Sequence, residues 1–346
     1  MTRQALGPNT HDPMASIFER LAGGPISWGV CEVPHWGAEL APERVLSEMA
    51  ALGLRATEAG PDGYLGSDPE AIVALLERHG LKLVGGFLPV VLHDPAEHGS
   101  SVASAHRVGA LFEAARASFL VSAVVVDLGW SARIRLSDEH WQAIFDGLSR
   151  LDEAAAAHNL THVAHPHWGT LVETRDDVSR LLDGSDVLLC LDTGHLVLSE
   201  TDPVWLAQAG GDRIAHVHLK DVAGPIADRL RAGELALVPA VQSGLFRPLG
   251  EGSAPVTDTV QALEDAGYRG WYVLEQDCAL PSADIPAGEG PIDDVRRSIE
   301  FLQSLLAGTH VEAQSGAASR TRARQAPSSA GSGETKDKRK GGDRHG

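Results

Sequence analysis

Imidazole and carboxylate side chains follow four short apolar segments between residues 162 and 277. Mixed nitrogen and oxygen ligands of this kind suit Mn, Co, Fe or Zn better than Ca. If the four segments are neighbouring strands of one sheet, these groups meet at the same edge and predict a divalent metal site. The groups are His165-Pro166-His167-Trp168-Gly169-Thr170, Leu191-Asp192-Thr193-Gly194-His195, His216-Val217-His218-Leu219-Lys220-Asp221 and Leu274-Glu275-Gln276-Asp277.

The third group contains two histidines and a lysine that allow more than one interpretation. His216 and His218 are two residues apart, so on a strand both rings lie on the same face. The outer ring can then be a ligand while the inner ring is hydrogen-bonded in the core. Lys220 is one of two lysines in residues 1–310, the other being Lys82. It can donate a proton, stabilise an enolate or form a salt bridge with Asp221.

Further candidate residues lie nearer the N-terminus and beside the histidines. Glu58 is a carboxylate that can bind a substrate hydroxyl or act as a base, or pair with Arg55. Trp28, Trp130 and Trp168 offer apolar faces on which a sugar ring can stack. Packing among loops is the alternative for each tryptophan.

The elements that must position these residues alternate between short β-branched runs and longer amphipathic stretches, which is typical of a parallel sheet with crossover helices. Eight such units in about 280 residues predict a single-domain (β/α)8 TIM barrel, whose chemistry lies where the strands end. The expected strands are 26–30, 55–59, 83–88, 123–128, 162–165, 187–192, 214–219 and 271–275. The expected helices are 42–52, 69–79, 102–117, 138–158, 175–182, 203–208, 256–266 and 292–306. The segment 222–254 is expected to be a lid or a partner-contacting loop on the catalytic side.

Charge divides the chain into an acidic body and a basic tail. The net charge is −18, but residues 311–346 contain eight of the 29 Lys and Arg and four of the 47 Asp and Glu, so residues 1–310 carry −22. So acidic a body repels phosphate backbones and excludes nucleic acid as its ligand. We expect an N-terminal extension over 1–24, a catalytic domain over 25–308 and a disordered tail over 309–346. Because no membrane span or signal peptide is evident, we expect a cytoplasmic protein; a homodimer is compatible with the sequence.

Motifs over most of residues 25–305 resemble the xylose isomerase-like TIM barrel superfamily of sugar isomerases and epimerases, and within it the inosose (2-keto-myo-inositol) dehydratases. The resemblance implies a TIM barrel that binds a divalent metal and a sugar or polyol substrate. It is carried by Pro25-Ile26-Ser27-Trp28-Gly29-Val30, Thr57-Glu58-Ala59-Gly60-Pro61, Gly85-Gly86-Phe87, His165-Pro166-His167-Trp168-Gly169-Thr170, Leu191-Asp192-Thr193-Gly194-His195, His216-Val217-His218-Leu219-Lys220-Asp221 and Trp271-Tyr272-Val273-Leu274-Glu275-Gln276-Asp277.

The resemblance also implies a ligand set in which this chain departs from the epimerases. Asp192, His218 and Glu275 match the ligands of strands six to eight, but His165 stands where epimerase-like members carry a glutamate. Epimerases resemble two-base enzymes, whereas dehydration needs one base and one acid, so His165 favours a dehydratase.

The resulting hypothesis is metal-dependent dehydration of a cyclic polyol ketone in inositol or carbohydrate catabolism. The alternatives are a metal-dependent sugar isomerase or epimerase and a non-catalytic sugar-binding barrel. Mn or Co is the expected ion, with Zn, Fe or Mg as alternatives. The expected ligands are His165, Asp192, His218 and Glu275; the expected catalytic residues are Glu275 or Glu58 as base and His195 or Lys220 as proton donor; the expected substrate contacts are His167, Trp28, Trp168 and Asp221.

Overall fold

The computed structural model describes residues 15–33 and 35–305. The expected disordered tail, 309–346, and most of the expected N-terminal extension lie outside these ranges. Within the described ranges no helix combines the length and the apolar composition that crossing a membrane requires.

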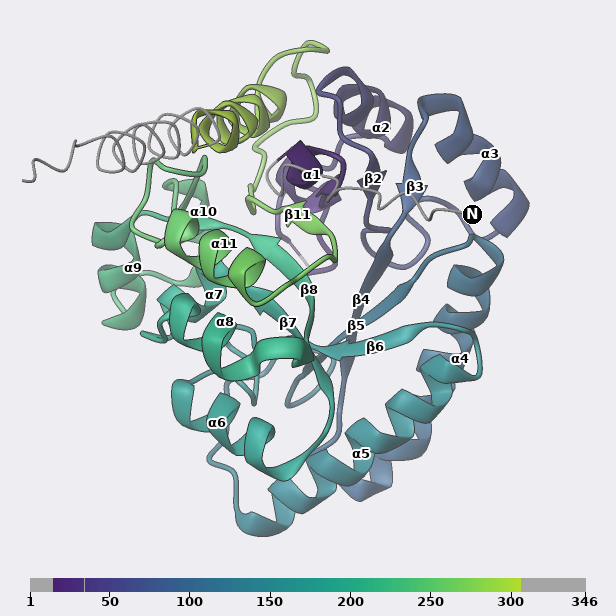
Figure 1. The fold of residues 1–346 in the computed structure, drawn as a ribbon, viewed down its shortest axis with the longest axis vertical. Helices are drawn as coiled ribbons and strands as arrows, with labels where there is room; N and C mark the ends of the chain where they lie inside the picture. The colour runs from purple at the N-terminus through teal and green to yellow at the C-terminus, as the bar shows by residue number, and fades with distance from the viewer. Residues whose placement is uncertain (1–14, 34, 306–346) are drawn as a thin grey trace, which may run out of the picture. The chain divides into compact units, whose positions relative to one another are not determined.

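Parallel strands form the centre of residues 15–304. Their order is β3-β2-β1-β11-β8-β7-β6-β5-β4 (Figure 1). The two ends of this order, β3 and β4, are separated in the chain only by Val84. The Val84 amide donates to the carbonyl oxygen of Thr57 at 2.9 Å, and the Val84 carbonyl accepts from Phe119 at 3.0 Å. Val84 therefore joins the two ends of the sheet, and the predicted TIM barrel is confirmed. The strands are β1 (Leu21–Gly23), β2 (Ala56–Thr57), β3 (Lys82–Leu83), β4 (Gly85–Val90), β5 (Phe119–Val124), β6 (Thr161–Ala164), β7 (Leu188–Asp192), β8 (Ile214–Leu219) and β11 (Tyr272–Leu274).

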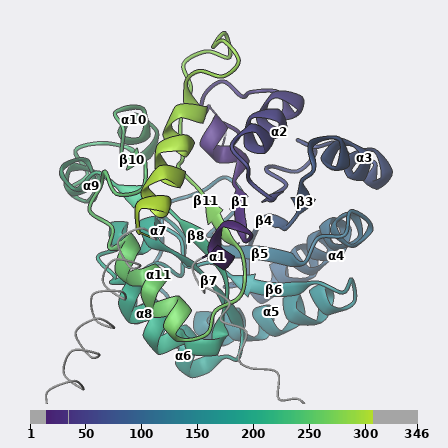
Figure 2. The ribbon, with the colours of Figure 1, turned by 45° about the horizontal axis from the view of Figure 1, so that its top comes forward.

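Helices surround the strands, as Figure 2 shows from a second direction. Two helices begin where the sequence predicts, because an aspartate caps each one and a proline follows in the first turn. Asp68 accepts the amide hydrogen of Glu70, and Asp202 accepts that of Val204. The helices are α1 (Ala15–Phe18), α2 (Pro42–Ala51), α3 (Pro69–His79), α4 (His98–Ala114), α5 (Asp138–Ala156), α6 (Arg175–Gly184), α7 (Thr193–Leu198), α8 (Pro203–Gly210), α9 (Gly224–Arg231), α10 (Leu237–Gln242) and α11 (Val256–Asp265), with a further helix over 291–305.

Two of the predicted strands are misplaced. The first strand was predicted over 26–30, but β1 is Leu21–Gly23, inside the segment expected to be an extension, and a 3-10 helix occupies Pro25–Trp28. Pro25 has no amide hydrogen for a strand ladder and suits the start of a helical turn. The strand predicted over 123–128 is β5, Phe119–Val124, and begins and ends four residues earlier. The apolar run extends to both sides of Ala123, and Leu128 at its end is 66% exposed.

The segment 222–254 contains regular structure. It holds α9 and α10, and an antiparallel pair formed by β9 (Asp221–Val222) and β10 (Phe246–Arg247). Buried Val222, Ala240 and Phe246 belong to one apolar cluster in this region. The segment is therefore a packed part of the fold beside the strand ends.

Candidate metal centre

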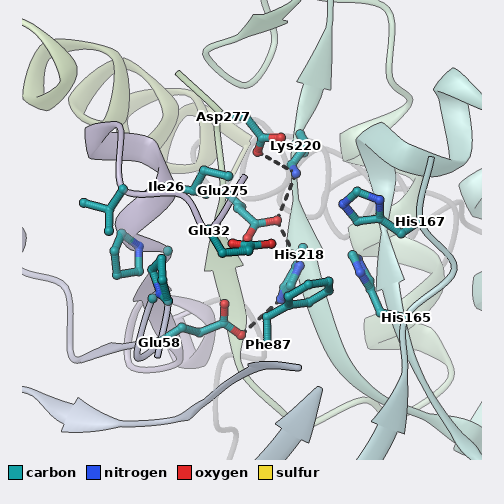
Figure 3. A pocket seen from close by; sticks show the side chains of 15 residues that line it. Ile26, Glu32, Glu58, Phe87, His165, His167, His218, Lys220, Glu275 and Asp277 are labelled. Carbon is teal, nitrogen blue, oxygen red and sulfur yellow. Dashed lines mark hydrogen bonds and ion pairs between the residues drawn. The ribbon is translucent and has the colours of Figure 1, made fainter. Parts of the chain in front are cut away.

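Four adjacent strands deliver the predicted metal ligands to one end of the barrel. The strands β11, β8, β7 and β6 are neighbours in the sheet. Asp192 and His218 are register partners, and His218 is also the partner of Val273. His165 and Glu275 each follow the last residue of a strand. Because all these strands are parallel, their carboxyl ends bring the four side chains to the same end of the barrel, where His165, His218 and Glu275 line one cavity (Figure 3).

The geometry of this cluster fits a shared cation. Asp192 Oδ2 lies 3.6 Å from His165 Nε2 and 3.6 Å from His218 Nδ1, and His218 Nδ1 lies 3.0 Å from Glu275 Oε2. Donor atoms about 2.1 Å from one ion lie roughly 3 Å or more apart, as these do. His165, Asp192 and His218 are at most 3% exposed.

Unpaired donor atoms give a second reason to expect an ion. Neither ring nitrogen of His165 has a hydrogen-bond partner, and neither does Asp192 Oδ2. A buried carboxylate oxygen or imidazole nitrogen without a partner is unfavourable. Among the described residues, three triads of donor atoms lie within 4.8 Å of one another, and His218 belongs to all three. The buried His, Asp and Glu side chains therefore have the composition and spacing of a metal site.

Asp192 has a second structural role through its other oxygen. Asp192 Oδ1 accepts the amide hydrogens of Gly194 and His195, both at 2.8 Å, and so caps α7. In the structure the two roles use different oxygens, so they coexist.

Lys220 lies beside the cluster and carries a positive charge there. Its Nζ is 2.7 Å from Asp277 Oδ1, 3.0 Å from Glu275 Oε2 and 3.5 Å from Asp192 Oδ2. Burial alone would lower the pKa of Lys220, but the three carboxylates outweigh it and hold the pKa well above its usual value. The salt bridge to Asp221, which was the alternative, is not formed.

The rings of His167 and His195 contact each other, tilted by 34°, next to Lys220. Their ring centroids are 3.6 Å apart, and His195 Nε2 is 3.0 Å from Lys220 Nζ. Burial lowers the pKa of His167 to about 3 and that of His195 well below its usual value, and nearby positive charge adds to both shifts. Both rings are therefore neutral, and His195 accepts a hydrogen bond from Lys220.

Glu58 is held by the two histidines of β8 and does not pair with Arg55. Its Oε1 is 2.8 Å from His216 Nε2 and 3.1 Å from His218 Nε2. His218 therefore faces the metal cluster with Nδ1 and Glu58 with Nε2. A carboxylate on the far nitrogen of a metal-binding histidine fixes the ring and makes it a better ligand. His216 is the hydrogen-bonded core histidine that the His-x-His spacing allows.

We predict that Glu58→Gln lowers the affinity for a divalent cation by about 10- to 100-fold, because a neutral amide oxygen is a weaker acceptor for the His218 ring than a carboxylate and does not make the ring a better ligand. Titration of the metal-free protein with Co²⁺ or Mn²⁺ measures this change. The control is Glu43→Gln, whose side chain is 65% exposed and pairs with Arg78. Unchanged affinity in Glu58→Gln would show that Glu58 does not support the ligand.

Trp28 and Asp221 do not line the cavity at the cluster. Trp28 is fully buried, and its indole nitrogen donates to Glu48 Oε2 at 2.7 Å, so it stabilises the core rather than a sugar ring. Asp221 accepts four backbone amide hydrogens, from Val222, Gly250, Gly252 and Ala254 at 2.8–2.9 Å. Asp221 therefore orders the loop after β10 and has no contact left for a substrate.

Asp221→Ala is expected to lower the free energy of unfolding by about 3 kcal/mol, because four amides lose a buried charged acceptor. Chemical denaturation measures this loss. The matched control, Asp228→Ala, removes a 73%-exposed carboxylate that pairs with Arg231 and should cost less than about 0.5 kcal/mol. Equal effects of the two substitutions would contradict the role of Asp221.

The structure adds two carboxylates that the sequence did not single out. Glu32 and Asp277 both line the cavity of the cluster. Asp277 lies two residues beyond Glu275, so its place after a strand was the available signal, whereas Glu32 lies in the loop beyond the 3-10 helix Pro25–Trp28. Burial, reinforced by the charge of Glu275, raises the pKa of Asp277 to about 7, against the opposing effect of Lys220.

Comparisons with known proteins identify the family of the chain. Residues 46–305 match the model of the family described as xylose isomerase-like TIM barrel. The chain is 32% identical to an inosose dehydratase of Geobacillus thermodenitrificans over 75% of this chain and 91% of the relative, and 33% identical to the rhizopine catabolism protein MocC of Rhizobium meliloti over 74% and 81%. A crystal structure of the IolI protein with a bound zinc atom aligns over 84% of this chain and 98% of that one, with a TM-score of 0.62 and 14% identity. The chain belongs to the xylose isomerase-like TIM barrel family.

Proposed function

We propose that this protein is a metal-dependent dehydratase of a cyclic polyol ketone of the inosose type. The observation that carries the proposal is the composition of the cavity at the strand ends. It is lined by three of the proposed ligands, His165, His218 and Glu275. It also holds the protonated Lys220, the neutral His167 and Glu32, a carboxylate with no hydrogen bond or ion pair to another side chain among the described residues. A single unengaged base, Glu32, beside a metal ion suits an elimination. The similarity to inosose dehydratases supports the substrate class.

The ion would be held by His165, Asp192, His218 and Glu275. Mn or Co is the expected ion for two imidazoles and two carboxylates, and Zn, Fe or Mg remain alternatives. When bound, a divalent cation polarises a carbonyl group and stabilises the enolate that forms when the adjacent carbon loses its proton. The zinc atom in the IolI structure, which shares the fold, is consistent with a divalent ion.

Glu32 is the base that the structure favours for this proton. Four carboxylates line the cavity. Glu58 is bonded to two histidines, Glu275 contacts His218 and Lys220, and Asp277 pairs with Lys220. Glu32 has no hydrogen bond or ion pair to another side chain in the described part of the chain. Glu32 as a whole is exposed, but desolvation by the residues around its carboxylate and the charge of Glu275 raise its pKa, which brings the base nearer to neutral pH.

Lys220 stabilises the negative charge that develops on the substrate. Its raised pKa keeps it protonated, so it acts as a fixed cation rather than as the proton source. The proton that Glu32 takes from the carbon next to the carbonyl passes to the departing hydroxyl group. The carbon–hydrogen and carbon–oxygen bonds break and water leaves. The enol that remains rearranges to a dione.

Metal removal tests the proposal. Dialysis against a chelator should abolish the loss of water from scyllo-inosose, and adding Mn²⁺ or Co²⁺ should restore it. Product formation is followed by mass, because epimerisation or isomerisation leaves the mass of the substrate unchanged. Turnover that survives complete metal removal would contradict the proposal.

A further inference from the structure

A second cavity opens beside the metal cluster and is larger than the first. Its volume is about 390 Å³, against about 60 Å³ for the cavity at the cluster. Ile26, Glu32, His167 and Asp277 line both, so the two spaces are adjoining chambers. Pockets of about 300 Å³ and above hold ligands larger than a single small ring.

The second chamber has walls that a bare polyol does not match. Away from the cluster they are formed largely by Trp36, Trp130, Trp168, Leu237 and Val238. A polyol ring carries hydroxyl groups on its edge, and a hydroxyl group buried without a partner is costly. An apolar group on the ring would instead gain from burial there.

Trp130 is held in this wall by a local turn. Its φ is +58°, in the left-handed region that bulky side chains rarely adopt. Asp127 Oδ1 accepts the amide hydrogens of Gly129 at 2.8 Å and Ser131 at 3.3 Å, and so fixes the turn around Trp130. The ring stacks on Phe87 with centroids 6.3 Å apart, and Phe87 lines the metal cavity. Backbone conformations of this kind are retained where they position a functional group.

Another part of the wall comes from the segment 222–254. Leu237 and Val238 begin α10, and they pack against the apolar cluster that contains Trp36 and Phe246. Phe246 in turn lies 6.2 Å from the His195 ring, measured between centroids. The segment therefore serves as a wall of the chamber and joins it to the site.

We propose that this chamber is a binding subsite for an apolar or aromatic substituent carried on the oxygen of a keto-polyol ring. The substrate class is then an ether or glycoside of a cyclic polyol ketone, with the ring at the metal cluster and the substituent between Trp130 and Leu237. The identity of the substrate rests on the proposed dehydratase function. The binding of the substituent in the chamber can be tested without it.

Calorimetric titration of the full chain compares myo-inositol with the isomers of mono-O-benzyl-myo-inositol, which lack the ketone and are not consumed. We expect at least one isomer to bind 10-fold or more tightly than myo-inositol. Trp130→Ala and Leu237→Asp should each weaken that isomer by 10-fold or more, and Leu237→Asp should change the affinity for myo-inositol less than 3-fold. The control is Trp205→Ala in α8, whose ring packs under Arg175 away from the chamber, and it should change neither.

The inference is overturned if no benzyl isomer binds more tightly than myo-inositol, or if the preference survives in both chamber variants. Failure of the proposed function looks different. In that case scyllo-inosose and its benzyl ethers lose no water, while the benzyl preference and its loss in the variants persist.

Discussion

Asp192→Asn is expected to lower turnover at least 1,000-fold and to remove tightly bound metal. The substitution keeps Oδ1, which caps α7 through Gly194 and His195, and replaces the unpaired Oδ2 that faces His165 and His218. An amide nitrogen is not a ligand for a divalent cation, and the negative charge is lost. Metal content after dialysis and the rate of water loss from scyllo-inosose measure the two effects.

The control for this variant is Asp202→Asn. Asp202 caps α8 in the same way, by accepting the amide hydrogen of Val204 at 2.9 Å, but it is exposed. It should keep both metal and activity, with the fold of both variants checked by circular dichroism. An Asp192→Asn protein that retains metal at the wild-type stoichiometry would contradict the assignment of the site.

Glu32→Gln is expected to lower kcat by about 100-fold or more, the usual contribution of a general base, without loss of metal. Glutamine keeps the size of the side chain but cannot accept the proton. Because the carboxylate must be ionised to act, the rate of the native protein should rise with pH through the raised pKa of Glu32, and this limb should be absent in the variant.

Glu39→Gln serves as the control, because Glu39 is an exposed carboxylate in the same stretch of chain and does not line the cavity. Retained metal together with retained kcat in Glu32→Gln would exclude Glu32 as the base. The role would then return to Glu275, the remaining base candidate from the sequence that faces the cluster.

The elements that the sequence predicted best have signals at both ends. The helix α3, Pro69–His79, begins at the Asp68-Pro69 cap and ends at Gly80, whose φ of +68° suits glycine, and its predicted bounds are those observed. The strand β8, Ile214–Leu219, also has its predicted bounds. By contrast β1 has three residues, too few to show alternation, and the more apolar segment after it was chosen instead.

Convergence of the four ligand-bearing strands followed from the order of the motifs, because parallel neighbours in a barrel end at the same rim. Contacts across the barrel did not follow. Glu58 meets His216 and His218 from the far side of the ring of strands, and Asp277 replaces Asp221 as the partner of Lys220. These pairs depend on the direction in which each side chain points and on the distance it spans, and neither can be obtained from a single sequence.

The most direct test is mass spectrometry of scyllo-inosose incubated with the metal-loaded protein, alongside the Asp192→Asn variant. We predict a product lighter by one water with the native protein and unchanged substrate with the variant. A product of unchanged mass would contradict dehydration and assign the site to isomerisation or epimerisation. No product from a protein with its metal bound would contradict inosose as the substrate.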